Sequence, residues 1–258
     1  MLAFARIAPT TRPEPIAIAS PDVDIWAFAL DEPAAIVESW SALLSGDERI
    51  RADRFVFRRD RSRWIVARGV LRHLLARYCG VEPSAMAFRY ARAGKPWIAH
   101  AGIGDAFVTF NLAHSHDRAL VAVARDREVG VDLERVRDDF DPMPIARRFF
   151  FGSELAAIEA AAPRSHREAF FRHWTAKEAV LKASGAGLSL ALDSFGVSFE
   201  AEGTIARVRA SGATTLDEKL IVRMLPLALE WHGAVAASGN DWTLRFPARA
   251  IDRGPVSL

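Results

Sequence analysis

The sequence has a single cysteine, Cys79, and no apolar run long enough to span a bilayer. A lone cysteine cannot form an internal disulfide, which suits a reducing compartment. A transmembrane helix needs about 20 apolar residues, and proline and charge soon interrupt the apolar start of the chain, unlike a secretory signal. We therefore expect a cytoplasmic protein with no membrane segment, in which Cys79 is a buried, inert thiol.

Net charge is also nearly absent. The formal charge is +2, although arginine greatly outnumbers lysine. This bias suits a phosphorylated small molecule or an acidic protein as well as a nucleic acid. The arginines form no stripe interleaved with aromatic residues, and no nucleic-acid-binding module is visible, so we expect no nucleic-acid partner.

The chain has 258 residues, and half of them are hydrophobic, enough for a sizeable core. Periodicity predicts strands over 24–30, 106–112, 119–124 and 128–134, and several short strands between 195 and 246. It predicts helices after the turn at 31–33, from 45 onward, and over 59–79, 144–151, 153–162 and 165–184. Residues 125–127 are interpreted as a hairpin turn. No linker interrupts this order, which indicates an α+β fold with helices packed on antiparallel sheet.

The stretch VGVDLE at 129–134 ends an apolar strand with two acids. Because strand side chains alternate, Asp132 and Glu134 share one face and repel each other. An amphipathic strand with a wet acidic face explains this pattern by itself. A magnesium site is the alternative, since hard divalent ions take a few carboxylates together with substrate phosphates.

The stretch WTAKEAVLK at 174–182 places Glu178 and Lys182 four residues apart on one helical face. As an exposed ion pair they would contribute only about 0.3–0.5 kcal/mol. If Glu178 instead lies near the acidic strand, Lys182 would meet a phosphate one turn further on. A carboxylate, a metal ion and a lysine suit phosphoryl-type transfer.

In these motifs the chain resembles the surfactin-synthetase-type (Sfp-type) 4′-phosphopantetheinyl transferases. The matching stretches are GKPW at 94–97, FNLAHS at 110–115, VGVDLE, ARRFFFGSE at 146–154 and WTAKEAVLKASGAGLSL from 174. They follow the family's order and spacing over about residues 47–199. The acidic strand and the lysine-glutamate helix are specific together, whereas either alone would only be suggestive.

The resemblance implies a pseudo-dimer of two similar α+β halves, which we expect at 1–127 and 128–258, with coenzyme A bound between them. It implies that a serine of an apo acyl or peptidyl carrier protein attacks the β-phosphate of coenzyme A and that adenosine 3′,5′-bisphosphate leaves. It also implies a Mg²⁺-dependent holo-[acyl-carrier-protein] synthase of secondary metabolism, acting as a monomer. The acidic carrier would meet a basic, apolar-edged patch, and Arg147 and Arg148 are candidates for part of it. The alternative, which ordinary helical alternation slightly favours, is that these arginines are plain surface and the phenylalanines at 149–151 are core.

By resemblance, three acids occupy the metal positions and are catalytic together with the active-site lysine: Asp132, Glu134, Glu178 and Lys182. The resemblance assigns coenzyme A contacts to Arg51, Arg63, Lys95, Pro96, His114 and, at the diphosphate, Lys182. Arg51 is the loosest match. The family often has serine before the histidine, where this chain has Ala113, so one phosphate contact is in doubt.

Several alternatives stay open. Either Glu178 or Glu134 could be the general base, and Mn²⁺ could replace Mg²⁺ because both take oxygen ligands. Paired histidines at 114 and 116 are a weak zinc signal without a cysteine or a distant third histidine. Two rival functions are a metal-dependent diphosphate hydrolase and a non-catalytic coenzyme A or nucleotide-binding module. The sequence does not say which carrier or pathway is served.

Overall fold

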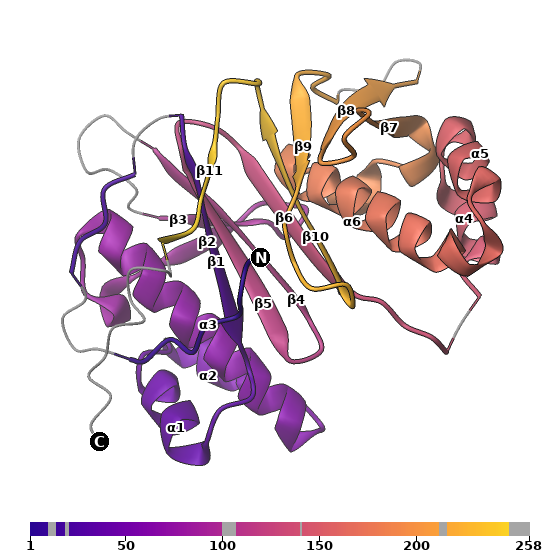
Figure 1. Ribbon diagram of the computed structural model, residues 1–258. Coiled ribbons are helices and arrows are strands. Elements are labelled where there is room, and N and C mark those ends of the chain that lie inside the picture. The colour runs from indigo at the N-terminus through magenta and orange to yellow at the C-terminus, as the bar shows by residue number, and fades with distance from the viewer. Residues whose placement is uncertain (10–13, 19–20, 100–106, 140, 212–215, 248–258) are drawn as a thin grey trace.

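The structure is a computed structural model and describes residues 1–9, 14–18, 21–99, 107–139, 141–211 and 216–247. Figure 1 shows helices at both ends of the molecule and two sheets between them. The α+β fold expected from the sequence is therefore confirmed. In the part of the chain that the structure describes, no helix is both long and apolar enough to cross a membrane.

The first half builds a sheet with the strand order β11-β1-β5-β4. Strand β1 pairs antiparallel with β5 and parallel with β11, so the last strand of the described residues returns to the first sheet. A separate two-stranded ribbon, β2-β3, carries the GKPW motif. The elements are β1 (Val23–Ala29), α1 (Ala34–Ala42), α2 (Gly46–Ala52), α3 (Arg58–Cys79), η1 (Pro83–Ala85), β2 (Phe88–Tyr90), β3 (Pro96–Ile98), β4 (Val108–Ser115) and β5 (Arg118–Arg125).

The second half repeats this sequence of elements. Its sheet has the order β6-β10-β9-β8-β7, so β6-β10-β9 corresponds to β1-β5-β4. The elements are β6 (Val129–Arg135), α4 (Met143–Phe149), α5 (Gly152–Ala160), η2 (Pro163–Ser165), α6 (His166–Ser184), η3 (Gly187–Ser189), η4 (Leu192–Ser194), β7 (Phe195–Phe199), β8 (Ile205–Ala210), β9 (Leu220–Met224), β10 (Trp231–Ser238) and β11 (Leu244–Arg245). The two similar halves implied by the resemblance are present.

Hydrophobic cores lie between successive layers. Because strand side chains alternate, Trp26 and Phe28 face helix α3, while Ile25 and Ala27 face the other sheet. A second core, between the sheets, holds Val129, Val131 and Leu133 of β6. A third lies between the second sheet and helix α6. Both long helices thus cover the outer faces of a double sheet.

Two sequence interpretations are corrected. The turn at 125–127 does not close a hairpin, because β5 lies in the first sheet and β6 in the second. The chain crosses between sheets there because β6 pairs with the distant β10. The strand expected to end at 112 continues to Ser115, and the hairpin turn follows at His116, where φ is +53°. The polar residues His114 and Ser115 therefore belong to strand β4, and the turn begins after them.

Candidate active site

Helix α6 and strand β6 bring the predicted lysine and one predicted acid into contact. Lys182 donates a hydrogen bond of 2.6 Å from Nζ to Oδ1 of Asp132. Asp132 is buried, while Lys182 keeps part of its side chain open to solvent. Two motifs fifty residues apart in the sequence therefore meet in one site.

Gly130 makes this close approach possible. A Cβ atom at residue 130 would lie 2.1 Å from the carbonyl oxygen of Ala179 and 2.3 Å from the amide nitrogen of Ala183. Helix α6 therefore packs its backbone directly on β6, which only glycine permits. The glycine of VGVDLE is a packing requirement that the sequence interpretation did not identify.

Glu134 and Glu178 both lie close enough to Asp132 for its charge to affect their pKa values. Burial, followed by the charge of Asp132, raises the pKa of Glu134 to about 7. The pKa of Glu178 is raised by the same two causes in the same order, and Lys182 opposes the shift. Burial also raises the pKa of Asp132, against the effect of Lys182. All three carboxyl groups thus favour a proton or a cation over bare charge.

The three acids suit a cation that takes further ligands from a substrate or from water. No three His, Cys, Asp or Glu side chains of the described residues are grouped closely enough to hold a metal by themselves. However, Oδ2 of Asp132 is buried and has no hydrogen-bond partner within the described structure. An orphaned oxygen beside two carboxyls of raised pKa suits a magnesium ion that completes its shell with substrate phosphates and water.

Strand β4 supplies the next residues of the site. The Ser115 hydroxyl donates to Oε2 of Glu134 at 3.2 Å, an interaction that the sequence did not predict. His114 lies close enough to Lys182 and Asp132 for both charges to affect its pKa. Desolvation of its ring and then the charge of Lys182 lower the pKa of His114. A neutral imidazole at pH 7 would offer a phosphate an N–H donor.

Ala113 occupies the opposite face of the same strand. It is buried in the core between the two sheets. A serine side chain at this position would therefore lie in that core, so the absence of its hydroxyl removes no donor from the face that carries His114.

Adjoining hollows next to His114 contain most of the predicted coenzyme A contacts. One, of about 200 Å³, is lined by Arg51, Pro96 and His114, among others. Another, of about 410 Å³, is lined by His114, His116 and Arg63. Arg63 is held by Asp31 through bonds of 2.6 and 2.8 Å, so a phosphate would have to share this guanidinium.

Lys95 joins the two halves of the molecule. Its ammonium donates to Oε2 of Glu128 at 2.6 Å and to the carbonyls of Val129 and Ala183 at 3.2 Å each. It lines a third hollow, of about 360 Å³, together with Pro96 and Gly185. The GKPW loop is thereby fastened to the first residue of β6 and to the end of α6.

Cys79 and Lys177 both lie in the interior of the protein. Cys79 is buried, as expected, and burial raises its pKa to about 11, which favours the unreactive thiol form. Lys177, which directly precedes Glu178, points inward, and its side chain is fully buried against Glu154. Nothing in the local spacing revealed this pair, because its acid comes from another helix.

The candidate docking residues sit on helix α4. Arg147 bonds Glu159 at 3.4 Å, and the guanidinium of Arg148 lies 5.1 Å from the ring centre of Phe149. Phe149 is exposed, whereas Phe150 is buried in the core of the helices. This edge of the molecule therefore offers a basic pair beside one exposed aromatic ring.

Both family models that match this chain, and the relatives compared with it, are of 4′-phosphopantetheinyl transferases. Residues 128–230 match the family described as the 4′-phosphopantetheinyl transferase superfamily, and residues 34–128 match the N-terminal region of 4′-phosphopantetheinyl transferases. The 4′-phosphopantetheinyl transferase HetI of a Nostoc species is 39% identical over 182 residues, which are 69% of this chain and 75% of HetI. A 4′-phosphopantetheinyl transferase of Bacillus subtilis is 28% identical, with 84% and 93% of the two chains covered.

Among solved structures, a holo-(acyl-carrier-protein) synthase from Bacillus anthracis, in complex with CoA (3′,5′-ADP), is similar with a TM-score of 0.35 and 18% identity. The match covers 44% of this chain and 96% of that one.

Proposed function

This chain belongs to the 4′-phosphopantetheinyl transferase superfamily, and from that premise we propose that it transfers 4′-phosphopantetheine from coenzyme A to a serine of an apo carrier protein. The observation that carries the proposal is the packing of α6 on β6. It sets Lys182 against Asp132, with Glu134 and Glu178 as electrostatic neighbours, beside hollows lined by arginine and histidine.

Coenzyme A would occupy the hollows around His114. Arg51 and Arg63 would meet its 3′-phosphate, and the Lys95–Pro96 loop would touch the nucleotide. Arginine suits this role because its planar fork binds phosphate in a bidentate manner. The diphosphate would then extend toward His114 and Lys182. Lys182 is available there because its side chain is partly exposed.

Asp132, Glu134 and Glu178 would hold Mg²⁺, or Mn²⁺ in its place. When bound, the ion would act as a Lewis acid on the diphosphate oxygens, neutralising their charge and making the phosphorus more electrophilic. Burial raises the pKa of all three carboxyls, and the charge of Asp132 adds to the shift at Glu134 and Glu178, so a bound cation would favour their charged forms.

The residues of the chain would perform the following chemistry. The carrier serine oxygen forms a bond to the β-phosphorus of coenzyme A, and the bond from that phosphorus to the bridging oxygen breaks. Adenosine 3′,5′-bisphosphate leaves with the bridging oxygen. Glu178 or Glu134 takes the serine proton, directly or through a water. Lys182 and His114 orient the diphosphate and stabilise charge on its oxygens.

The partner would be an acyl or peptidyl carrier protein, an acidic helical bundle. Arg147 and Arg148, beside exposed Phe149, would form part of its docking surface. We propose a monomer divided at about 1–127 and 128–258, because the second sheet already supplies the neighbour that the first requires.

Intact-protein mass spectrometry tests the proposal. An apo carrier protein incubated with coenzyme A, Mg²⁺ and this protein should gain the mass of phosphopantetheine, and a chelator should abolish the gain. We expect Glu178→Gln to lower the rate by roughly 100- to 10,000-fold, the usual range for a lost general base. Glu168→Gln, an exposed change on the same helix, is the matched control.

The outcomes separate the rival functions. Near-normal turnover by Glu178→Gln would remove Glu178 from the mechanism. Cleavage of coenzyme A without labelling of any carrier would favour the diphosphate hydrolase. Binding of coenzyme A without either reaction, across fatty-acid, polyketide and peptidyl carriers, would favour the binding module.

A further inference from the structure

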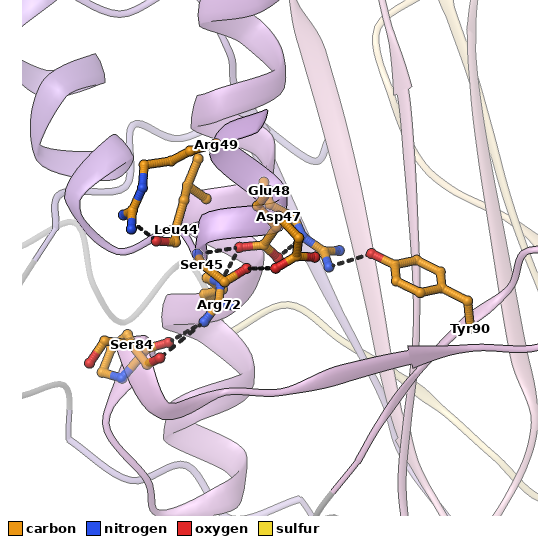
Figure 2. Close-up of polar contacts among 10 residues, drawn as sticks. Leu44, Ser45, Asp47, Glu48, Arg49, Arg72, Ser84 and Tyr90 are labelled. Atoms are coloured by element: carbon orange, nitrogen blue, oxygen red, sulfur yellow. Dashed lines mark hydrogen bonds and ion pairs between the residues drawn. The ribbon is translucent and has the colours of Figure 1, made fainter. Parts of the chain in front are cut away.

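Away from the candidate active site, each half of the described structure contains a buried glutamate bound by basic side chains. We name the first the Glu48 cluster: Glu48, Arg68, Arg72 and Tyr90. Glu48 accepts hydrogen bonds from Arg68 at 2.5 Å and from Arg72 at 2.6 Å. Figure 2 shows Glu48 between the backbone of Ser45 and Arg72, with Tyr90 reaching in from strand β2. All three charged side chains are almost fully buried.

We name the second the Glu154 cluster: Glu154, Lys177 and the backbone groups that they bind. Lys177 donates to both oxygens of Glu154, at 2.7 and 3.0 Å, and to the carbonyl of Phe195. Glu154 also accepts from the amide of Val197 at 2.7 Å. Helix α5, helix α6 and strand β7 are joined at this one point.

The two clusters occupy equivalent places. Each glutamate accepts a 2.9 Å hydrogen bond from the backbone amide three residues before it, at the start of a short helix. Each long helix ends at a glycine of positive φ, Gly80 or Gly185. Arg72 lies eight residues before the first glycine, and Lys177 lies eight residues before the second. Equivalent residues in the two halves thus bind a buried acid.

The clusters differ in what they hold. Arg68 donates to the Tyr90 hydroxyl at 2.8 Å, and both residues line the hollow that also contains Arg51, Pro96 and His114. The cluster therefore ties α2, which carries Arg51, and the β2-β3 ribbon, which carries Pro96, to helix α3. In the other half, Lys177 directly precedes Glu178 and lies five residues before Lys182 on the same helix.

We propose that the two clusters are positioning devices with separate tasks: the Glu48 cluster shapes the coenzyme A hollow, and the Glu154 cluster orients Glu178 and Lys182. This inference rests on the proposed function. Neither cluster touches the reacting atoms. Arg68 and Lys177 act through the residues that they hold.

Stability alone does not account for these clusters. Replacing a buried ion pair with well-packed apolar residues is often neutral or stabilising, because desolvation offsets the attraction. A buried ion pair does fix the positions of its side chains, because a buried donor that loses its acceptor costs free energy. Supporting residues of this kind commonly change affinity or activity without touching the ligand.

The experiment compares two double variants and a control. Glu48→Gln with Arg68→Met removes the link to Tyr90 but leaves an acceptor for Ser45 and Arg72. Glu154→Gln with Lys177→Met removes the second ion pair and leaves one carbonyl oxygen, which can accept from the backbone amide of Phe151 or of Val197 but not from both in their present geometry. The control, Glu200→Gln with Arg207→Met, removes an exposed pair. Calorimetry gives the coenzyme A dissociation constant, and carrier labelling at saturating coenzyme A gives kcat.

We expect the Glu48-cluster variant to raise the coenzyme A dissociation constant about 10- to 100-fold with kcat nearly unchanged. We expect the Glu154-cluster variant to lower kcat by about 10- to 100-fold and to change coenzyme A affinity much less than the Glu48-cluster variant does, because Lys182 is only one of the proposed coenzyme A contacts. Tyr90→Phe, an exposed change of one hydroxyl, should raise the dissociation constant in the same direction with no loss of folding.

Two results would overturn the inference. One is a proportional change of affinity and kcat in both variants, which indicates a common loss of folded protein. The other is a coenzyme A dissociation constant and a kcat that both stay unchanged in the two double variants. Tyr90→Phe should then leave the dissociation constant unchanged as well. Failure of the proposed function is a different result, because the unmodified protein would then bind no coenzyme A or label no carrier.

Discussion

At the scale of single residues, the site is dominated by carboxyl groups that are out of water and close to one another. Asp132 is stabilised by Lys182 through a 2.6 Å bond, yet its second oxygen has no hydrogen-bond partner in the described structure. Within the described part of the chain, Glu134 accepts a hydrogen bond of 3.2 Å from the Ser115 hydroxyl. Such groups oppose folding when charged, which is a cost that functional sites often retain.

Glu134 leads to a prediction about stability. Its pKa of about 7 lies above the usual value of 4.5. The folded chain therefore holds this proton between pH 4.5 and 7, and the carboxyl opposes folding most strongly above pH 7. We expect Glu134→Gln to raise the free energy of unfolding at pH 8 by about 1–2 kcal/mol after solvent screening is allowed for.

Thermal unfolding at pH 8 and pH 4.5 measures this effect. The gain should be present at pH 8 and absent at pH 4.5, where the carboxyl is protonated in the folded protein. Added Mg²⁺ should stabilise the unmodified protein at pH 8 more than it stabilises the variant. A variant that is less stable than the unmodified protein at pH 8 would contradict the raised pKa.

Lys182 leads to a prediction about catalysis. Lys182→Met keeps the length of the side chain but removes the charge beside the diphosphate position. We expect kcat for carrier labelling to fall by about 100- to 1,000-fold, the usual cost of losing one preorganised donor. The exposed change Lys219→Met is a suitable control. A kcat unchanged by Lys182→Met would exclude Lys182 from the transfer step.

At the scale of elements, the site depends on one helix lying directly on one strand. Periodicity correctly predicted both, and α6 spans His166–Ser184, close to the expected 165–184. Their separation could not be predicted, because it depends on the space at Gly130 across the interface. The same holds for β4, which was expected to end at 112 but is paired with β5 to Ser115.

Gly130→Ala tests the close approach. The added Cβ would overlap the backbone of Ala179 and Ala183, which cannot move like a flexible side chain. We expect loss of about 2–4 kcal/mol of stability, in the range of overpacked cores and larger single changes, together with loss of most activity. Gly46→Ala is the matched control, since no atom lies within 4 Å of a Cβ there.

Equilibrium denaturation and carrier labelling measure the two effects. A Gly130→Ala protein with normal stability and normal activity would show that α6 and β6 can separate without harm. The helix-strand contact would then not be what sets Lys182 against Asp132.

At the scale of the whole molecule, two similar halves produce a single candidate site. Counting back from Gly80 and Gly185, His73 takes the place of Glu178 and Arg77 takes the place of Lys182. His73 is buried, and desolvation lowers its pKa to about 4. The first half thus keeps the scaffold and the buried acid cluster but lacks the carboxylate on its long helix.

The halves are also joined through polar contacts. The side-chain oxygen of Asn111 accepts a hydrogen bond of 3.0 Å from the amide of Val131, across the two sheets. We expect Asn111→Leu to leave that amide buried and unpaired, which costs about 1–3 kcal/mol. A lowered melting temperature, with exposed Asn240→Ala as the unaffected control, would support this role. An unchanged melting temperature would show that the sheets need no such bond.

The sequence by itself determined the α+β class, most helices and strands, and the motifs that place the chain in its family, because these depend on local periodicity and residue type. Tertiary structure alone decided that β5 and β6 belong to different sheets, that Lys177 is buried on Glu154, and that Gly130 allows α6 to touch β6. Each of these features depends on contacts between residues that are far apart in the sequence, and the local sequence pattern does not show which distant residues come into contact.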